Sequence, residues 1–399
     1  MFLYFFVLYI ASLFNKKARL LVRGQSRTLS LLADKVKSGD RWIWFHAASV
    51  GEFEQGRPII ERLRKEQPDK KILLTFFSPS GYELRKDYDG VDLVAYLPFA
   101  TRRNVSRFLS VLKPEKAVFI KYEFWPAYLN ALKKAGTPTY LISAIFNPKQ
   151  AFFKWWGGAY RQLLTAFTLL FVQDEASRQL LEKYNITNVE VAGDTRFDRV
   201  VNVAEHACED AIMEAFTLGA QSVIVAGSTW PQDEKLLARF LTEHQEVKMV
   251  VVPHEIHLSH LQQIFQMFKG RYVLYSQATR QSVEMTRCLV VDTIGMLSEI
   301  YRYATVAYIG GGFGVGIHNT LEAATYAKPI LFGPNYQRFR EARGLIEHGA
   351  AVSINSYKTL EASMLSLLSA PQEAGKAARE YVESELGATD KIYSKMLGD

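Results

Sequence analysis

The chain has 399 residues, more than one hydrophobic core organises comfortably, so two domains are expected. The hydrophobic content of 48% suits a folded globular protein. The two cysteines, Cys208 and Cys288, exclude a zinc or redox motif by their spacing and are expected to be buried thiols of a reducing compartment.

The net charge of +7 is unevenly distributed. Residues 1–200 carry 31 Lys and Arg against 19 Asp and Glu, whereas residues 201–399 carry 17 against 22. The basic half indicates contact with nucleic acid, phospholipid or a phosphorylated glycolipid. The alternative is a surplus that only keeps the surface soluble.

The first 14 residues form an apolar, aromatic run, Met1–Phe14, which is followed by four basic residues, Lys16, Lys17, Arg19 and Arg23. The run is shorter than the roughly 20 residues that span a bilayer. A secretory signal would place its charges before the apolar run. We therefore predict a shallow anchor over residues 1–14 at the cytoplasmic face of a membrane, with a helix buried in the protein core as the alternative.

From Arg41 onward, apolar strand-like runs alternate with amphipathic helix-like segments. This alternation predicts α/β domains with parallel sheets covered on both faces. We expect two doubly wound, Rossmann-like domains, 15–200 and 201–399, which face a central cleft. The helical stretch Ala374–Leu386 is a candidate to pack back on the first domain. Ligands of such sheets bind at the carboxyl ends of the strands. The expected strands are Trp42–His46, Ile72–Phe76, Leu93–Tyr96, Ala117–Ile120, Thr139–Ile142, Leu169–Val172, Val189–Val191, Ser222–Ala226, Val247–Val252, Tyr272–Leu274, Cys288–Val291, Val306–Ile309 and Pro329–Phe332.

Three charged residues of the first half follow strands. Glu52 comes after Trp42–His46, at the start of a helix, where a partly desolvated carboxylate can accept a proton from an attacking hydroxyl. The alternative is a carboxylate that only complements a helix N-terminus, whose dipole would weaken it as a base. Glu123 could pair with a cation or stabilise developing positive charge; the alternative is a carboxylate solvated at the surface. Arg196, at the domain junction, could neutralise a leaving phosphate.

The second half contains the most informative stretch, a glycine cluster after the strand Val306–Ile309. Glycines let a backbone approach an anion closely, and Gly311 and Gly312 are the candidates here. Residues 319–322 (Asn319, Thr320, Leu321 and Glu322) open a helix, where Glu322 can accept hydrogen bonds from a ribose diol. The spacing fits neither the dinucleotide fingerprint nor a P-loop, so a different nucleotide site is indicated; a glycine-rich turn without a ligand is the alternative.

Other segments of the second half close strands and should face the same cleft. They contribute Ser228, Thr229, Pro253, His254, Ile294, Gly295 and Met296. Two apparent metal motifs are discounted. The first, Asp87-Tyr88-Asp89, is expected in a charged surface turn. The second consists of histidines spaced three residues apart, which would lie on different faces of a helix and could not bind one ion together: His254, His257 and His260.

Taken together, these segments resemble the 3-deoxy-D-manno-octulosonic acid (Kdo) transferase family over nearly the whole chain. The resemblance is carried, in order, by FHAASVGE, YEFWP, GDTRFD, AGST, VVP, DTIG, GGGFG, HNTLEAA and KPILFGPN. It implies a GT-B fold, CMP-Kdo as donor, lipid IVA as acceptor and attachment to the cytoplasmic face of the inner membrane. It also implies an inverting, metal-independent transfer without a cofactor and without nucleic acid as a partner.

By the same resemblance, Glu52 matches the catalytic base, Glu123 a residue that stabilises the transition state, and Asn319–Glu322 the stretch that holds CMP. Three positions depart from the family pattern. Arg196 replaces a lysine, Pro253-His254-Glu255 lacks an arginine expected near the CMP phosphate, and Ile294-Gly295-Met296 lacks a carboxylate.

Two other functions stay open at this point. A membrane-associated GT-B transferase that uses a UDP-sugar would share most of these features. A non-catalytic protein that binds a membrane or nucleic acid through its basic half would also fit, although RNA-module aromatic motifs are missing from the sequence.

Overall fold

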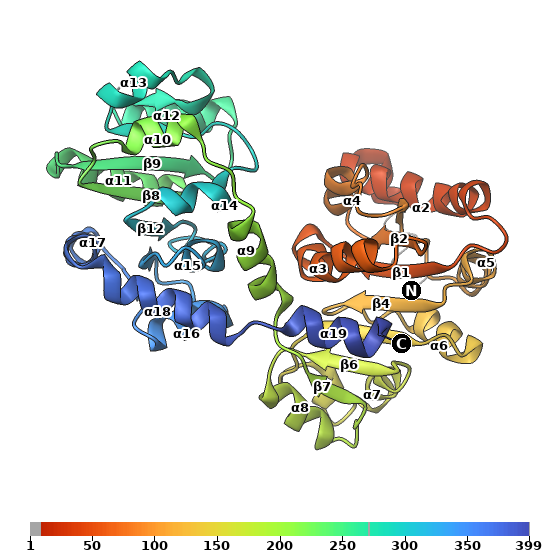
Figure 1. The fold of residues 1–399 in the computed structure, drawn as a ribbon. Helices are drawn as coiled ribbons and strands as arrows, with labels where there is room; N and C mark the ends of the chain where they lie inside the picture. Colours follow the sequence, from red (N-terminus) through yellow and green to blue (C-terminus); the bar gives the residue numbers. More distant parts are fainter. Residues whose placement is uncertain (1–8, 270–271, 399) are drawn as a thin grey trace. The chain divides into compact units, whose positions relative to one another are not determined.

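The computed structural model describes residues 9–269 and 272–398 and divides into two compact units. The first unit comprises the chain up to Asp198 together with Leu386 and the residues after it, and the second comprises Arg199–Glu385. Helix α9 (Thr195–Glu205) contains the division. Figure 1 shows a sheet with covering helices in each unit.

The first unit is built on a seven-stranded sheet in the order β3-β2-β1-β4-β5-β6-β7, in which every pairing is parallel. Its strands are β1 (Trp42–Ala47), β2 (Lys71–Phe76), β3 (Leu93–Tyr96), β4 (Lys116–Ile120), β5 (Thr139–Ala144), β6 (Leu169–Val172) and β7 (Val189–Val191). Its helices are α2 (Lys16–Lys35), α3 (Val50–Glu66), α4 (Pro79–Arg85), α5 (Arg102–Leu112), α6 (Pro126–Ala135), η1 (Ala151–Phe153), α7 (Gly158–Leu164), α8 (Glu175–Glu182) and α19 (Ala388–Leu397).

The second unit repeats the doubly wound plan, with the parallel order β10-β11-β9-β8-β12-β13-β14. Its strands are β8 (Ser222–Thr229), β9 (Val247–Pro253), β10 (Val273–Leu274), β11 (Cys288–Val290), β12 (Val306–Ile309), β13 (Ile330–Phe332) and β14 (Ala351–Ser353). Its helices are α10 (Ala211–Thr217), α11 (Pro231–Glu243), α12 (Leu258–Met267), η2 (Tyr275–Gln277), α13 (Arg280–Met285), α14 (Leu297–Ile300), η3 (Tyr301–Tyr303), α15 (Leu321–Ala324), α16 (Arg340–Glu347), α17 (Tyr357–Ser369) and α18 (Pro371–Ser384).

Strand β1 shows why the sheets are buried on both faces. All six of its residues are buried. Trp42 and Trp44 belong to the hydrophobic cluster on one face, whereas Ile43 and Phe45 belong to the cluster on the other. Successive side chains of a strand point to opposite faces, so a continuous apolar run is what a sheet covered on both sides requires.

The end of the chain corrects one expectation. Residues 374–386 were expected to pack back on the first domain, but most of them lie in α18, within the second unit. The helix that joins the first unit is α19, which carries Ile392, Tyr393, Met396 and Leu397 into a hydrophobic cluster shared with α3 and β1. The apolar face of α19 is therefore buried by residues more than 300 positions earlier in the chain.

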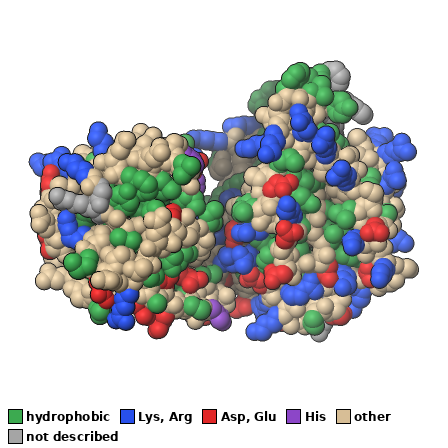
Figure 2. Space-filling view, turned by 90° about the horizontal axis from the view of Figure 1, so that it is seen from above, with side chains coloured by type: hydrophobic (Ala, Val, Ile, Leu, Met, Phe, Trp, Pro, Cys, Tyr) green, Lys and Arg blue, Asp and Glu red, His purple; other side chains and the backbone are tan. Residues whose placement is uncertain are grey.

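Residues 9–14 of the expected anchor are helical, and residues 1–8 lie outside the described part. Tyr9, Leu13 and Phe14 are exposed, with Phe14 at 86%. Figure 2 shows Lys and Arg side chains spread over the first unit, the right-hand body of the view. No helix among the described residues has the length and apolar character to cross a bilayer.

Both cysteines were expected to be buried. Cys288 is buried, whereas Cys208 is exposed.

Candidate active site

Glu52 lies one turn into α3, directly after β1. Ser49 is the N-cap of the helix, and its hydroxyl accepts the Glu52 amide at 3.4 Å. In return the Glu52 Oε2 accepts the Ala48 backbone N–H at 2.6 Å. This reciprocal arrangement resembles a capping box and fixes the direction of the carboxylate. The expected helix-capping role is thus present in the structure.

The capping hydrogen bond alone would lower the pKa of Glu52, but the pKa is raised. Burial raises the pKa of Glu52 above 4.5, and the negative charge of Glu123 raises it further, against the lowering effect of the Ala48 hydrogen bond. A raised pKa makes a carboxylate a better proton acceptor. The electrostatics of the first unit therefore favour Glu52 as a general base, although the helix dipole was expected to weaken it.

Glu123 is at the centre of a buried hydrogen-bond network. This residue follows β4 and is 8% exposed. The Oε2 atom lies 2.9 Å from His46 Nε2 and accepts the Trp125 indole N–H at 2.6 Å. Burial would raise the pKa of Glu123, but these hydrogen bonds and the His46 ring outweigh it and lower the pKa. Glu123 is consequently a fixed negative charge rather than a surface carboxylate.

The network continues to the neighbouring strand through the His46 ring. His46 Nδ1 lies 2.9 Å from Thr75 Oγ1, which also accepts the Trp44 indole N–H. His46 is fully buried at the carboxyl end of β1. Sequence reasoning passed over this histidine; its place in the segment before Glu52 was the available signal.

Arg196 is held at the start of α9 by a neighbouring acid. Its Nε and Nη2 atoms lie 2.9 and 2.7 Å from Asp194 Oδ2, and its backbone N–H donates to Asp194 Oδ1. Asp194 is 1% exposed. A phosphate that approached Arg196 would therefore share the guanidinium with a buried carboxylate.

In the second unit, residues from separate segments line one cavity of about 340 Å³. Five of them were predicted from the sequence: Ser228, His254, Gly295, Asn319 and Glu322. The lining also contains Leu297, Ser298 and His318. The cavity follows the carboxyl ends of β8, β9 and β12, where a doubly wound sheet binds its ligands.

Two local conformations shape this cavity. Ser228 adopts a left-handed φ of 52°, which turns the chain at the end of β8. Asn319 accepts the Leu321 backbone N–H at 3.1 Å and donates from Nδ2 to Glu322 Oε1 at 2.9 Å. Asn319 thus holds the Glu322 carboxylate at the cavity wall.

Two of the lining residues, His254 and His318, belong to a stack of aromatic rings. The rings of Trp230 and His254 lie 5.0 Å apart, and those of His254 and His318 lie 4.2 Å apart. Trp230 donates its indole N–H to His318 Nε2 at 3.1 Å. Because the indole can only donate, neutral His318 must carry its own proton on Nδ1. Burial and the neighbouring His254 lower the pKa of His318 to about 4, so the ring is neutral at pH 7.

The glycine cluster has a steric role. A Cβ at Gly310 would lie 2.2 Å from the Ser228 carbonyl oxygen, and one at Gly312 would lie 2.5 Å from the Gly333 nitrogen. Gly311 has a φ of 89°, and its N–H donates to Asp233 Oδ2 at 2.9 Å. The glycines allow close packing around the cavity, and the Gly311 amide is already used within the protein.

The remaining predicted residues do not line the cavity. Thr229, Thr320 and Leu321 are buried, and Thr229 donates its hydroxyl to Glu234. Pro253 ends β9, Ile294 is 86% exposed, and Met296 Sδ accepts the Thr293 hydroxyl.

The residues of the two discounted metal motifs are accounted for by the structure. Asp87 and Asp89 are exposed. His257 caps α12, and His260 lies 3.0 Å from Glu234. His254 belongs to the ring stack.

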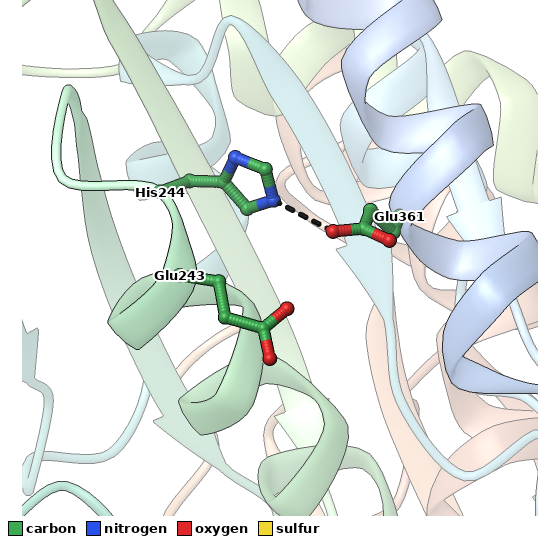
Figure 3. A group of neighbouring side chains, drawn as sticks. All are labelled: Glu243, His244 and Glu361. Atoms are coloured by element: carbon green, nitrogen blue, oxygen red, sulfur yellow. Dashed lines mark hydrogen bonds and ion pairs between the residues drawn. The ribbon is translucent and has the colours of Figure 1, made fainter.

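A different group of possible metal ligands comprises Glu243 and His244 at the end of α11 and Glu361 on α17 (Figure 3). His244 Nε2 lies 3.0 Å from Glu361 Oε1, and Glu243 accepts hydrogen bonds from Arg239 at 2.8 Å and from Tyr357. These contacts satisfy the group without a cation. It precedes β9 and so lies at the amino edge of the sheet, away from the cavity.

Comparison with known proteins gives a consistent result. A sequence model of the 3-deoxy-D-manno-octulosonic-acid transferase (kdotransferase) family matches residues 19–199. The 3-deoxy-D-manno-octulosonic acid transferase of Rickettsia typhi is 26% identical over 89% of this chain and 78% of its own length. That of Aquifex aeolicus is 26% identical over 83% of this chain and 87% of its own length.

Among solved structures, UDP-GlcNAc 2-epimerase from Neisseria meningitidis, bound to UDP-GlcNAc, matches with a TM-score of 0.63 at 15% identity. The match covers 90% of this chain and all of that one, and it shows the shared GT-B fold. The relatives match both sequence halves, and the resemblance predicted from the motifs is confirmed. The chain is therefore similar, over most of its length, to the Kdo transferases, a family of glycosyltransferases.

Proposed function

We propose that the protein transfers Kdo from CMP-Kdo to a hydroxyl of an acylated disaccharide phosphate, such as lipid IVA, in lipopolysaccharide biosynthesis. The observation that supports this most is the agreement between the similarity to Kdo transferases and the raised pKa of Glu52. A family motif can be retained in a protein without activity, but a half-buried carboxylate poised to accept a proton is what the reaction needs.

In the proposed reaction the acceptor hydroxyl attacks the anomeric carbon of Kdo while the bond to the CMP phosphate breaks. Glu52 accepts the hydroxyl proton, and the phosphate leaves with the bonding electrons. One displacement of this kind inverts the anomeric configuration. No metal or cofactor takes part in this scheme.

The second-unit cavity is proposed to hold the CMP. Glu322, oriented by Asn319, would accept hydrogen bonds from the ribose hydroxyls, as a carboxylate near a helix start does in other nucleotide sites. The ring stack of His254 and His318 would offer a flat surface to the ligand, in which the His318 ring is neutral. Ser228 could donate its hydroxyl to a phosphate oxygen at the cavity rim.

The roles of Glu123 and Arg196 follow from their charges. Positive charge develops on the sugar as the donor bond breaks, and the fixed negative charge of Glu123 would stabilise it, together with the ionised Glu52. Arg196 remains a candidate for the leaving phosphate, with Asp194 setting its direction. Because the segment Pro253-His254-Glu255 has no arginine, Arg196 would carry more of this task.

The acceptor is proposed from the charge of the chain and its apolar start. A phosphorylated, acylated disaccharide combines anionic and apolar groups, and the basic half and residues 1–14 suit such a molecule at the cytoplasmic face of the inner membrane.

The deciding experiment incubates purified protein with CMP-Kdo and lipid IVA and measures the product by mass spectrometry. One or more Kdo additions are expected. UDP-sugars in place of CMP-Kdo should give no product; product with UDP-sugars alone would contradict the proposal and favour the UDP-sugar transferase. Binding to membranes or RNA without turnover of either donor would favour the non-catalytic alternative.

A further inference from the structure

An exposed pair of tryptophans stands out on the first unit. Trp155 is 94% exposed and Trp156 is 51% exposed, in the turn between η1 and α7. Tyr160, one helical turn further on, is 47% exposed. We call these three residues the aromatic tip. Side chains this large and apolar are rarely left in water without a partner.

The turn that presents the aromatic tip is rigidly built. Arg161 donates from Nη1 to the Phe152 carbonyl at 2.7 Å, and its guanidinium lies over the Tyr184 ring. A Cβ at Gly157 would lie 2.2 Å from the Ala151 carbonyl oxygen, so the turn closes only with glycine.

The rings of the tip continue into the core. Trp156 packs edge-on against Tyr160 at 5.9 Å, and Tyr160 packs edge-on against the buried Phe152 at 6.2 Å. The exposure of Trp155 is therefore imposed by its support and does not result from a loose loop.

The chain segment that carries the tip has formal charges of one sign. Between Glu123 and Asp174 the chain has no Asp or Glu, and it has five Lys and Arg. Two of these are exposed near the tip: Lys154 in the same turn and Lys149 just before η1. Tryptophan and tyrosine beside lysine is the composition that proteins place at the boundary between lipid tails and headgroups.

We infer that the aromatic tip inserts into the interface of an anionic phospholipid bilayer, with Lys149 and Lys154 at the headgroups. The turn lies in the connection between β5 and β6 of the first unit, which also carries Glu52, and its Phe153 carbonyl accepts the Tyr184 hydroxyl. Docking here holds the first unit, which carries the base, at the membrane that contains a lipid-linked acceptor. This inference rests on the proposed membrane partner, but not on the identity of the transferred sugar.

The test uses full-length protein and vesicles of phosphatidylcholine and phosphatidylglycerol brominated at acyl carbons 6 and 7. Bromine quenches only tryptophans that enter the bilayer. Quenching is expected in the natural protein and is expected to disappear in Trp155→Phe/Trp156→Phe, which removes the two fluorophores of the tip. Equal quenching in both proteins would overturn the inference, even if residues 1–14 hold the protein on the vesicle.

Partition between vesicles and solution gives the second readout. Trp155→Ser/Trp156→Ser should weaken partition about tenfold, the effect of losing one to two kcal/mol of apolar burial. Lys149→Glu/Lys154→Glu should weaken it on phosphatidylglycerol vesicles but not on pure phosphatidylcholine. The matched control Leu258→Ser/Met285→Ser removes two side chains of the second unit that are 80% and 86% exposed and should change nothing.

Turnover separates this inference from carbohydrate binding and from the proposed function. With a detergent-dispersed acceptor, the tip variants should turn over as the natural protein does. Lost turnover with unchanged partition would mean that the tryptophans bind the acceptor sugar, and the inference would fall. If neither the natural protein nor the variants transfer Kdo but the quenching is as expected, the result contradicts the proposed reaction and still supports the docking surface.

Discussion

Replacement of Glu52 by glutamine tests the proposed mechanism most directly. Glutamine keeps the size of the side chain and an oxygen that can accept the Ala48 N–H, which Glu52 accepts at 2.6 Å. It cannot accept a proton from the acceptor hydroxyl. The change therefore removes the base while leaving the start of α3 in place.

General base catalysis typically contributes 10²–10⁴-fold, which corresponds to about 3 to 5 kcal/mol of transition-state stabilisation. We expect kcat to fall by this factor in Glu52→Gln. Affinity for CMP should be unchanged, since the proposed nucleotide cavity is made entirely by residues of the second unit.

The stability of the same variant should move in the opposite direction. Because the folded protein raises the pKa of Glu52, the folded state binds a proton more tightly than the unfolded state does. Ionisation above the folded pKa therefore disfavours the folded state, and glutamine removes that penalty at neutral pH. The melting temperature of Glu52→Gln at pH 7 should equal or exceed that of the natural protein.

The assay measures single-turnover transfer from CMP-Kdo, CMP affinity by calorimetry and thermal unfolding. Glu66→Gln, on the same helix and paired with Arg62, is the matched control and should retain full turnover. In the natural protein, kcat/KM should rise with pH through a pKa above 4.5, and in Glu52→Gln this rise should be lost. Turnover within threefold of the natural protein, or parallel loss of CMP binding, would refute the assignment of Glu52 as base.

Three further outcomes are expected. Glu123→Gln should destabilise the protein by about 1 to 3 kcal/mol at pH 7 through weakened buried hydrogen bonds. The pKa of Glu123 in the folded protein lies below 4.5, so the ionised carboxylate stabilises the fold above pH 4.5 and this stabilisation is lost as the pH falls through the folded pKa. The unfolding curves of the variant and the natural protein should therefore converge in acid. Gly312→Ala should reduce thermal stability by about 1 to 3 kcal/mol and weaken CMP binding, because its Cβ would meet the Gly333 backbone; unchanged calorimetry would contradict the steric role. Ile392→Ala should destabilise the protein by about 2 to 5 kcal/mol in chemical denaturation, and no change would mean that α19 is not held by the first core.

Much of the fold was predictable from local pattern. Continuous apolar runs identified thirteen of the strands with small errors at their ends, because a strand covered on both faces must be apolar throughout. The exception is β14, whose three residues follow Gly349 with only one fully buried side chain, too short a run to be distinguished from a turn. The last helix was expected to pack back on the first domain, and it does, but it is α19 rather than residues 374–386, since nothing in the residues of either helix indicates which of two cores will bury its apolar face.

Some features of the candidate site were likewise predictable from the sequence, and others depend on the tertiary structure. The order of the motifs along the chain indicated the family, the GT-B fold and the residues Glu52, Asn319 and Glu322, because these depend on residue type and spacing. The basicity of Glu52 depends instead on burial and on Glu123, and the charge of Glu123 depends on His46, 77 residues away. The neutral ring of His318 likewise depends on its burial against His254. A pKa is set by whatever lies within a few ångströms, and folding brings those groups together from distant parts of the chain.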